Sequence, residues 1–534
     1  MSSVARTTLR RGPRFTYAVA TAWSVVAILL GYAVLDVADA APGLLTLRPL
    51  PPPPPTEYVA TRTLPLVPQP SLPTSVDAPL PSLVGDPAAP TRAGVEQALA
   101  PVLALSALRD SAVVVRDGQT GAVLLDRGGD QLRIPASTTK LLSAAAIGQA
   151  FTPGETLRTV VREGDRPDQI VLVAGGDSLL APGKGDTEAV AGHAGLRDLA
   201  EQVAAALAKS GTTAVTLYVD ETYADGPTTA PTWSPTFRSS GITGAVAMLG
   251  LSSQRATGGK PGPADPVAAV RGRFAQQLEA LGVAVTVAPR GNAPGTPGSP
   301  MPTPTPTASS ATTGSSTTSS DATPTDGATV TTTASAAGTG SAPTSGPGSV
   351  LGSVESAPVR DQLALALTDS DNALTEILAR QAAYRSGART DFAAVGTWVV
   401  TQVAALGLAT DGVRLLDASG LSRENRVRAD LLADVLVLGY DGTHPVLRRA
   451  LDGLPIAGLT GTLAERLTGS DHAAAGRARA KTGTLTGANA LAGSVVDDDG
   501  RLLVFVGMVA GAGTNDARAA LDRLVATVAS CGCR

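Results

Sequence analysis

A serine and a lysine three residues apart could form a nucleophile and its base. Ser137 and Lys140 lie at the start of an apolar run that predicts a buried helix after Pro135. Side chains three residues apart lie on the same face of a helix. A serine hydroxyl attacks poorly until a base removes its proton, and a desolvated neutral lysine is such a base. We therefore expect Ser137 to be a nucleophile and Lys140 its general base, although chance spacing is the alternative.

The scarcity of lysine supports a special role for Lys140. The 42 basic residues include five lysines, and none of the other four has a serine three residues before it. Arginine supplies positive charge nearly everywhere else, but a guanidinium does not lose its proton, whereas a buried ammonium can.

A second motif is formed by Ser370, Asp371 and Asn372, which precede an apolar helical pattern. Among the five asparagines of the chain, Asn372 alone has a serine two residues before it. The Ser370 hydroxyl could pass a proton between Lys140 and a leaving amine, and the Asn372 amide could hold a substrate carbonyl and the lysine. An ordinary helix cap is the alternative interpretation, since serine and aspartate are good N-cap residues.

The third motif is Lys481-Thr482-Gly483-Thr484, directly before a predicted pair of strands near the C-terminus. A strand that carries two hydroxyls and an ammonium at a sheet edge suits an extended peptide ending in a carboxylate. Gly483 would allow that peptide to approach closely. Taken alone, the motif is equally consistent with a surface turn.

Together the three motifs describe one reaction. They occur in the order Ser-x-x-Lys, Ser-x-Asn, Lys-Thr-Gly, as in serine β-lactamases and penicillin-binding proteins. Burial and the neighbouring Lys481 would disfavour the charged form of Lys140. Backbone N–H groups of Ser137 and Thr484 could form the oxyanion hole.

The chain resembles the class C low-molecular-mass penicillin-binding proteins, which are D-alanyl-D-alanine carboxypeptidases and endopeptidases. The resemblance spans roughly residues 95–527 and includes, beyond the three motifs, residues 172–180, 417–425 and 453–463. It departs at residues 251–254, where the asparagine of the family is absent, so the preference for substrate side chains stays open.

The resemblance implies an α/β fold: a penicillin-recognising serine transpeptidase-like domain, with a sheet flanked by helices, and an inserted smaller, mostly β domain. It also implies an acyl-enzyme at Ser137 and inhibition by β-lactams. The substrates would be peptidoglycan peptides ending in D-Ala-D-Ala. No cofactor or metal is implied, and His193, His444 and His472 are too scattered in the sequence for a zinc site.

Two other functions remain open. A serine β-lactamase would need a fast route to hydrolyse the acyl-enzyme, and no residue for that is evident. A silent peptidoglycan-binding scaffold would have no reason to keep the scarce lysines. The net charge of −4 is too weak and too mixed to suggest a nucleic-acid partner.

The first residues resemble an export signal. Four arginines, at positions 6, 10, 11 and 14, precede an apolar segment at 17–35. This length is close to the ~20 residues that span a bilayer. We expect an anchor in the cytoplasmic membrane and a protein acting in the cell envelope, although Ala38-Asp39-Ala40 would also suit cleavage and secretion.

Composition and patterning divide the rest. The expected segments are 1–40 (signal anchor), 41–91 (proline-rich linker), 92–157 (first part of the transpeptidase-like domain), 158–290 (inserted domain), 291–349 (disordered Thr/Ser/Pro/Gly/Ala-rich tract) and 350–534 (second part). Apolar patterns predict strands at 111–117, 121–126, 169–174, 215–220, 488–496 and 502–509. They predict helices at 95–109, 196–208, 374–384, 392–406, 429–438 and 515–530. Cys531 and Cys533, the two cysteines, could form a small ring or stay free.

Overall fold

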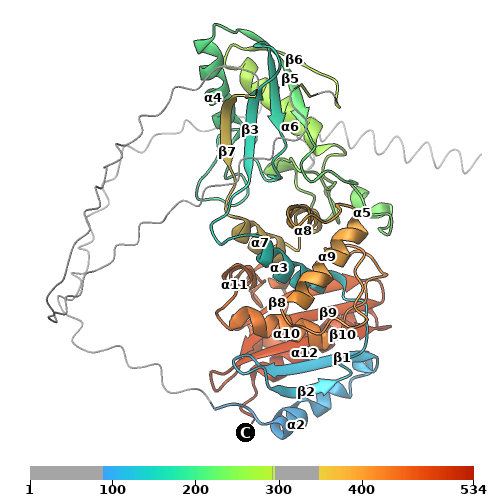
Figure 1. The fold of residues 1–534 in the computed structure, drawn as a ribbon. Helices are drawn as coiled ribbons and strands as arrows, with labels where there is room; N and C mark the ends of the chain where they lie inside the picture. The colour runs from blue at the N-terminus through green and yellow to red at the C-terminus, as the bar shows by residue number, and fades with distance from the viewer. Residues whose placement is uncertain (1–87, 292, 295–347, 534) are drawn as a thin grey trace, which may run out of the picture. The chain divides into compact units, whose positions relative to one another are not determined.

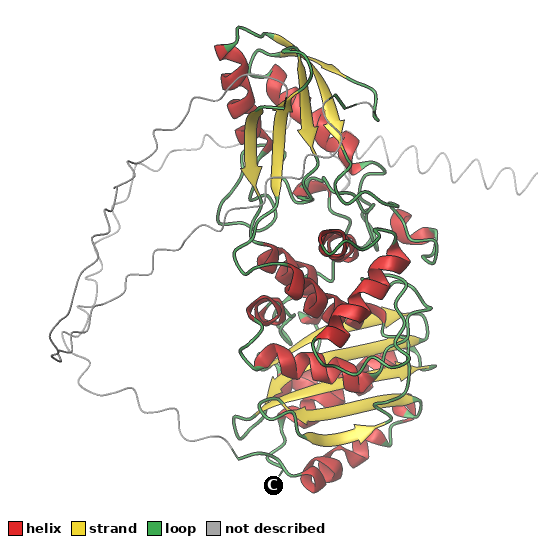
Figure 2. Ribbon diagram, in the orientation of Figure 1, coloured by secondary structure: helices red, strands yellow, loops and turns green. Residues whose placement is uncertain are grey.

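Two five-stranded sheets organise the protein, and the helices that carry the predicted site lie between them (Figure 1). The structure is a computed structural model, and it describes residues 88–291, 293–294 and 348–533. Figure 2 shows the same view by secondary structure, with one sheet at each end of the layer of helices. The chain is therefore of the mixed α/β class that the sequence predicted.

The first sheet joins both ends of the described chain. Its strand order is β2 (Val123–Arg127), β1 (Ser111–Asp117), β10 (Leu502–Ala510), β9 (Ala488–Val496) and β8 (Ala478–Leu485). All neighbouring pairs are antiparallel. β9 and β10 are buried on both faces, which explains why their sequences are continuous apolar runs rather than alternating ones.

Helices cover both faces of this sheet. α2 (Arg92–Leu103) and α12 (Thr514–Ala529) form one hydrophobic core with it. α3 (Thr139–Ala150) and α10 (Ala429–Tyr440) contribute to the other core. That second core also includes α7 (Val359–Thr368), α9 (Phe392–Ala405) and α11 (Pro445–Asp452).

The predicted opening helix at 95–109 differs from the observed elements. α2 begins three residues earlier, because the Thr91 hydroxyl accepts a hydrogen bond from Gly94 N at 3.1 Å and caps the helix. It ends at Leu103, and the extended backbone of Leu105 separates it from a 3₁₀ turn at Ser106–Leu108.

The second sheet belongs to the inserted region. Its strand order is β6 (Ala284–Val287), β5 (Ala214–Asp220), β4 (Gln169–Val173), β3 (Arg158–Glu163) and β7 (Val350–Glu355). α4 (Leu196–Lys209) and α6 (Pro266–Glu279) share its hydrophobic core. The inserted region thus carries more helix than the mostly β domain we expected.

β7 corrects the expected start of the second part at residue 350. This strand pairs with β3 in antiparallel register, with Arg158 opposite Glu355 and Val161 opposite Gly352. The chain thus completes the second sheet after the 291–349 tract and only then enters α7. Pairing between segments so far apart in sequence leaves no local signal, so composition placed the boundary too early. The other expected boundaries stay predictions.

α8 (Asn372–Arg385) links the two cores. Leu378, Ala379 and Ala382 contribute to the core of the helical layer, whereas Ile377 contributes to the core of the second sheet. The helix is buried almost along its whole length because it has neighbours on both sides. Its first residue belongs to the second sequence motif, which therefore lies where the two parts of the protein meet.

Two expectations concern the chain ends. The predicted anchor at 1–40 lies outside the described residues, as do most of the predicted linker and most of the predicted disordered tract. Within the described ranges, no helix is both long and apolar enough to cross a membrane. Cys531 and Cys533, for which two states were open, are paired in a disulfide.

Candidate active site

A strained turn presents Ser137 at the entrance of α3. Residues Ala136–Thr138 form one 3₁₀ turn, and Ala136 has a φ of +48°. This left-handed conformation costs a non-glycine residue on the order of 1 kcal/mol and persists where the surroundings hold it. The Thr138 and Thr139 hydroxyls donate to the carbonyls of Pro135 and Ala136, at 2.7 and 2.8 Å.

Two glycines allow the backbone to close around this turn. A Cβ on Gly483 in β8 would lie 2.8 Å from the carbonyl oxygen of Pro135. A Cβ on Gly420, where φ is +90°, would overlap the carbonyl oxygen of Ala136. The Ser137 turn is therefore packed directly against β8 on one side and the 417–425 loop on the other, and neither glycine position has room for a side chain.

Gly420→Ala should slow acylation of Ser137 by a fluorescent penicillin, because the new methyl group must displace the Ala136 carbonyl. Gly407→Ala is the matched control, since Gly407 also has a positive φ (+81°) but has no atom within 4 Å of the added Cβ. Both variants should lose roughly 1 kcal/mol of stability from the left-handed backbone, as thermal unfolding would show. Equal labelling rates for the two variants would mean that this contact does not position Ser137.

Lys140 Nζ lies at the centre of three acceptors. It is 3.2 Å from Ser137 Oγ, 2.5 Å from Asn372 Oδ1 and 2.7 Å from the carbonyl oxygen of Ser419. A neutral amine has two N–H donors and one lone pair. With the amide and the carbonyl taking the two donors, the lone pair is directed at the Ser137 hydroxyl. This is the geometry required of a base that removes the serine proton.

The Ser419 carbonyl is a contact that the sequence motifs did not reveal, and buried carboxylates hold it in place. Glu376 in α8 accepts hydrogen bonds from the backbone N–H groups of Ala418 and Ser419, both to Oε1, at 3.0 and 2.8 Å. Asp417 accepts a hydrogen bond from Gly420 N at 2.9 Å. It also accepts one from Nε1 of Trp233, a residue of the inserted region, at 2.6 Å. The resemblance at 417–425 was the signal that pointed to this loop, but it assigned no role to these residues.

Burial governs the protonation of Lys140 and Lys481. The Lys140 side chain is wholly buried, and burial lowers its pKa to about 8 despite the opposing effect of Asp417, Glu376 and Asp371. Lys481 is equally buried, and burial followed by the charge of Lys140 lowers its pKa well below the usual range. We expected Lys481 to depress the pKa of Lys140; the structure instead shows the stronger effect on Lys481, because the carboxylates lie around Lys140. Burial and Asp417 also raise the pKa of Glu376 to about 7.

The second motif lies in a turn between α7 and α8. Ser370 has a φ of +55°, and its hydroxyl accepts a hydrogen bond from Lys481 Nζ at 2.8 Å. Asp371 caps α8 by accepting from Leu374 N at 3.0 Å, so the cap interpretation is also correct. Asn372 uses both ends of its amide, because Nδ2 donates to the carbonyl oxygen of Ile242 at 2.7 Å while Oδ1 holds Lys140.

The third motif lies on β8, the edge strand of the first sheet. The segment 455–457 covers the outer edge of β8 as far as residue 480, where Ala480 N donates a hydrogen bond to the Pro455 carbonyl at 3.0 Å. Because strand residues alternate, the N–H groups of Thr482 and Thr484 face the same outer edge as that of Ala480. Beyond residue 480 the edge can therefore accept an extended peptide.

Two threonine side chains line the β8 edge. The Thr482 hydroxyl bonds with that of Thr462 at 2.9 Å, and the exposed Thr484 hydroxyl accepts from Arg518 at 3.3 Å. Thr462 and Arg518 were not among the predicted site residues. The three motifs therefore converge on one place: Ser137, Lys140 and Asn372 form one hydrogen-bonded group, and Ser370 with Lys481 forms another.

The histidines lie elsewhere. His193 and His472 bond to the nearby carbonyl groups of Ala189 and Gly469, and His444 lies beside Thr443. Across the described ranges 88–291, 293–294 and 348–533, no group of three His, Cys, Asp or Glu side chains is arranged to hold a metal ion.

Comparison with known proteins supports an assignment for this geometry. Residues 95–285 and 319–531 match the family described as D-Ala-D-Ala carboxypeptidase 3 (S13). A carboxypeptidase DacB of Mycolicibacterium smegmatis is 33% identical over 451 residues, covering 83% of this chain and 85% of that protein. A D-alanyl-D-alanine carboxypeptidase of Actinomadura sp. (strain R39) is 30% identical over 432 residues, covering 73% of this chain and 76% of that protein.

One solved structure shows the same fold. The crystal structure of penicillin-binding protein 4 from Haemophilus influenzae matches with a TM-score of 0.57 and 17% identity, covering 82% of this chain and 98% of that one. At this identity the likeness concerns the fold, and it confirms the expected α/β architecture with a second sheet.

Proposed function

The chain belongs to the D-Ala-D-Ala carboxypeptidase 3 (S13) family, and we propose that Ser137 is its nucleophile in hydrolysing the terminal D-Ala-D-Ala bond of peptidoglycan stem peptides. One observation carries the proposal: Ser137 Oγ lies 3.2 Å from a wholly buried Lys140 amine whose other contacts are an amide oxygen and a carbonyl oxygen. Buried lysines that can lose their proton are the bases that such a serine requires.

The reaction follows from these positions. A stem peptide lies along the open part of β8, with Thr482 and Thr484 at its C-terminal end. Lys140 removes the Ser137 proton, and Oγ forms a bond to the carbonyl carbon of the penultimate D-alanine. Backbone N–H groups of Ser137 and Thr484 hold the oxyanion. The C–N bond then breaks, and the proton reaches the leaving D-alanine amine through Ser370 and Lys481.

Water completes the cycle by hydrolysing the ester at Ser137, which regenerates the hydroxyl and releases the shortened peptide. A β-lactam ring presents the same kind of carbonyl carbon, so its amide bond opens at Ser137 and the drug stays attached. The same chemistry acts on cross-links when the leaving amine belongs to a neighbouring stem peptide, which is the endopeptidase reaction that the resemblance implies.

The structure favours a peptidase over a β-lactamase. Many serine β-lactamases hydrolyse the acyl-enzyme with a water molecule held by a carboxylate. Two of the carboxylates that act on Lys140 are engaged by backbone groups here. Glu376 holds Ala418 N and Ser419 N, and Asp417 holds Gly420 N and Ser422 N. The silent-scaffold alternative is disfavoured because Lys140 contacts the Ser137 hydroxyl and Lys481 contacts the Ser370 hydroxyl, as the proposed reaction requires.

The test is release of D-alanine from a pentapeptide ending in D-Ala-D-Ala, with a D-Ala-L-Ala peptide as the control substrate. We expect release from the first peptide alone, together with a stable penicillin adduct. Rapid loss of penicillin without a stable adduct would support the β-lactamase instead. A cross-linked muropeptide in parallel would measure the endopeptidase reaction.

We also propose that the enzyme works outside the cytoplasm and is held there by the apolar segment at 17–35. Four arginines precede that segment, an arrangement that leaves the positive end inside the cell. Full-length protein should therefore sediment with membranes, and deletion of residues 1–40 should leave it in the cytoplasm. If cells that express the full-length chain instead release into the medium a protein that lacks residues 1–40, the result would support a cleaved signal.

A further inference from the structure

We propose that Arg255 of the inserted region is a positioning residue of this active site. It clamps the Asp369–Asp371 turn and thereby holds Ser370 and Asn372 against the two lysines. This inference rests on the proposed function and goes beyond it, because it gives the inserted region a part in the chemistry.

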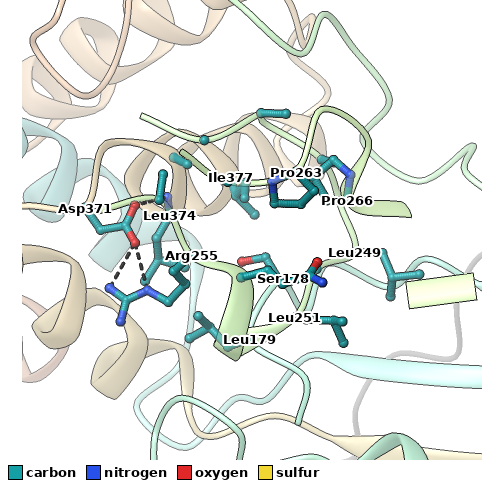
Figure 3. A pocket seen from close by; sticks show the side chains of 18 residues that line it. Ser178, Leu179, Leu249, Leu251, Arg255, Pro263, Pro266, Asp371, Leu374 and Ile377 are labelled. Atoms are coloured by element: carbon teal, nitrogen blue, oxygen red, sulfur yellow. Dashed lines mark hydrogen bonds and ion pairs between the residues drawn. The ribbon is translucent and has the colours of Figure 1, made fainter. Parts of the chain in front are cut away.

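The clamp is a fork of hydrogen bonds from Arg255, in the inserted region, to the two aspartates that flank Ser370. Arg255 Nε donates to Asp371 Oδ2 at 3.0 Å, as Figure 3 shows. Arg255 Nη2 donates to Asp369 Oδ2 at 2.9 Å. Nη2 also lies 2.9 Å from Asp371 Oδ2. One planar guanidinium therefore bridges the carboxylates on both sides of Ser370, which a point charge such as lysine ammonium does less well.

The turn needs such support. Ser370 adopts a φ of +55°, a conformation that non-glycine residues keep only where surrounding contacts impose it. Its hydroxyl must stay within reach of Lys481 Nζ, now at 2.8 Å. With both neighbours of Ser370 tied to one guanidinium, the turn cannot relax toward a right-handed conformation without breaking ion pairs.

A second contact from the inserted region acts on the same motif. The Ile242 carbonyl accepts a hydrogen bond from Asn372 Nδ2 at 2.7 Å, and this fixes which amide atom faces Lys140. Arg255 thus holds Asp369 and Asp371, and the Ile242 carbonyl holds Asn372.

Arg255 is partly withdrawn from water. Its side chain is 20% exposed and that of Asp371 is 10% exposed. Both line a small cavity of about 50 Å³, whose wall also includes Leu179, Leu251 and Ile377 (Figure 3). Ion pairs shielded in this way are less screened than exposed pairs, so loss of one partner leaves the other charge in a poorly solvated place.

The clamp also has an electrostatic effect on Lys140. The charged groups that face Lys140 are Asp371, Glu376, Asp417 and Lys481. Asp371 favours the ammonium form of Lys140, and Arg255 balances that carboxylate. Without Arg255, the uncompensated charge of Asp371 would raise the pKa of Lys140 and leave less free base at neutral pH.

The experiment measures the rate of penicillin acylation against pH for the full-length protein. In Arg255→Gln we expect a rate at about pH 6.5 that is lower by roughly three- to tenfold, with the rising limb of the profile displaced to higher pH. Arg255→Lys keeps the charge, so its limb should stay near that of the wild type. The matched control is Arg197→Gln, which removes a half-buried arginine paired with Glu201 in α4 of the same region.

A double-variant cycle separates positioning from general destabilisation. If Arg255 acts through the charge of Asp371, Arg255→Gln should no longer displace the pH profile in an Asp371→Asn background. An unchanged profile in Arg255→Gln, or a loss of rate equal at every pH and equal in both backgrounds, would overturn the inference while Ser137 acylation still supported the proposed function. Absence of acylation in the wild type would overturn the proposed function itself, and this inference with it.

Discussion

Ser137→Ala should abolish both penicillin labelling and D-alanine release, reducing the latter by a factor on the order of 10⁴ or more. The reason is that Ser137 is the hydroxyl that bonds to Lys140 Nζ among the residues the structure describes. Ser370 is bonded to Lys481, and the hydroxyls of Thr138 and Thr139 donate to backbone carbonyls. Removing Oγ therefore removes the atom that forms the acyl bond in the proposed mechanism. The fold should survive, because Ser137 is half-buried and its hydroxyl bonds to Lys140.

The measurement compares covalent adduct formation by mass spectrometry in the wild type, Ser137→Ala and Ser386→Ala. Ser386 lies at the end of α8, where its hydroxyl bonds to the Ala382 carbonyl, and its loss should leave labelling intact. An adduct on folded Ser137→Ala would place the nucleophile elsewhere, and Ser370 would be the first residue to examine.

The local parts of this site could be predicted from the sequence. Ser137 and Lys140 come together because one helical turn joins them, and β9 has the bounds that its apolar run predicts. Strands buried on both faces and helices with long apolar patterns carry their signal within a few residues. The three motifs were also recognisable, because each is a short segment with an unusual combination of residue types.

The contacts that complete the site could not be predicted in this way. The Ser419 carbonyl reaches Lys140 from 279 positions away, and Ile242 reaches Asn372 from 130 positions away. Both use backbone oxygen, which every residue possesses, so neither residue type gives any signal. Arg255 and the strand β7 depend in the same way on how distant segments pair, which a single sequence read locally does not specify.

The two lysines divide the work according to their surroundings. Asp417, Glu376 and Asp371 favour the charged form of Lys140. Burial and the charge of Lys140 instead both lower the pKa of Lys481 well below its usual range. The positive charge of Lys140 therefore disfavours a proton on Lys481. In the proposed mechanism, loss of the Lys140 proton activates Ser137, so activity should follow the titration of Lys140.

Acylation should accordingly rise with pH and level off above about 8, the pKa that burial gives Lys140. Below that value the neutral fraction, and with it the rate, falls about tenfold for each pH unit. Lys140→Arg should lower the rate by roughly 10²–10⁴-fold and remove this limb, because a guanidinium keeps its proton. The profile of penicillin acylation between about pH 5 and 10 is the measurement.

Two further variants decide what Lys140 supplies. Lys140→Met removes the amine but fills nearly the same volume of this wholly buried position. It therefore tests whether Lys140→Arg loses activity only because the larger arginine does not fit. Lys209→Arg, at an exposed lysine, is the control for the exchange itself. If Lys140→Arg kept both the rate and the limb, the residue would supply only positive charge, and the base would have to be Lys481 acting through Ser370. Loss of the rate in both folded Lys140 variants, with Lys209→Arg unaffected, would assign the removal of the Ser137 proton to the Lys140 amine.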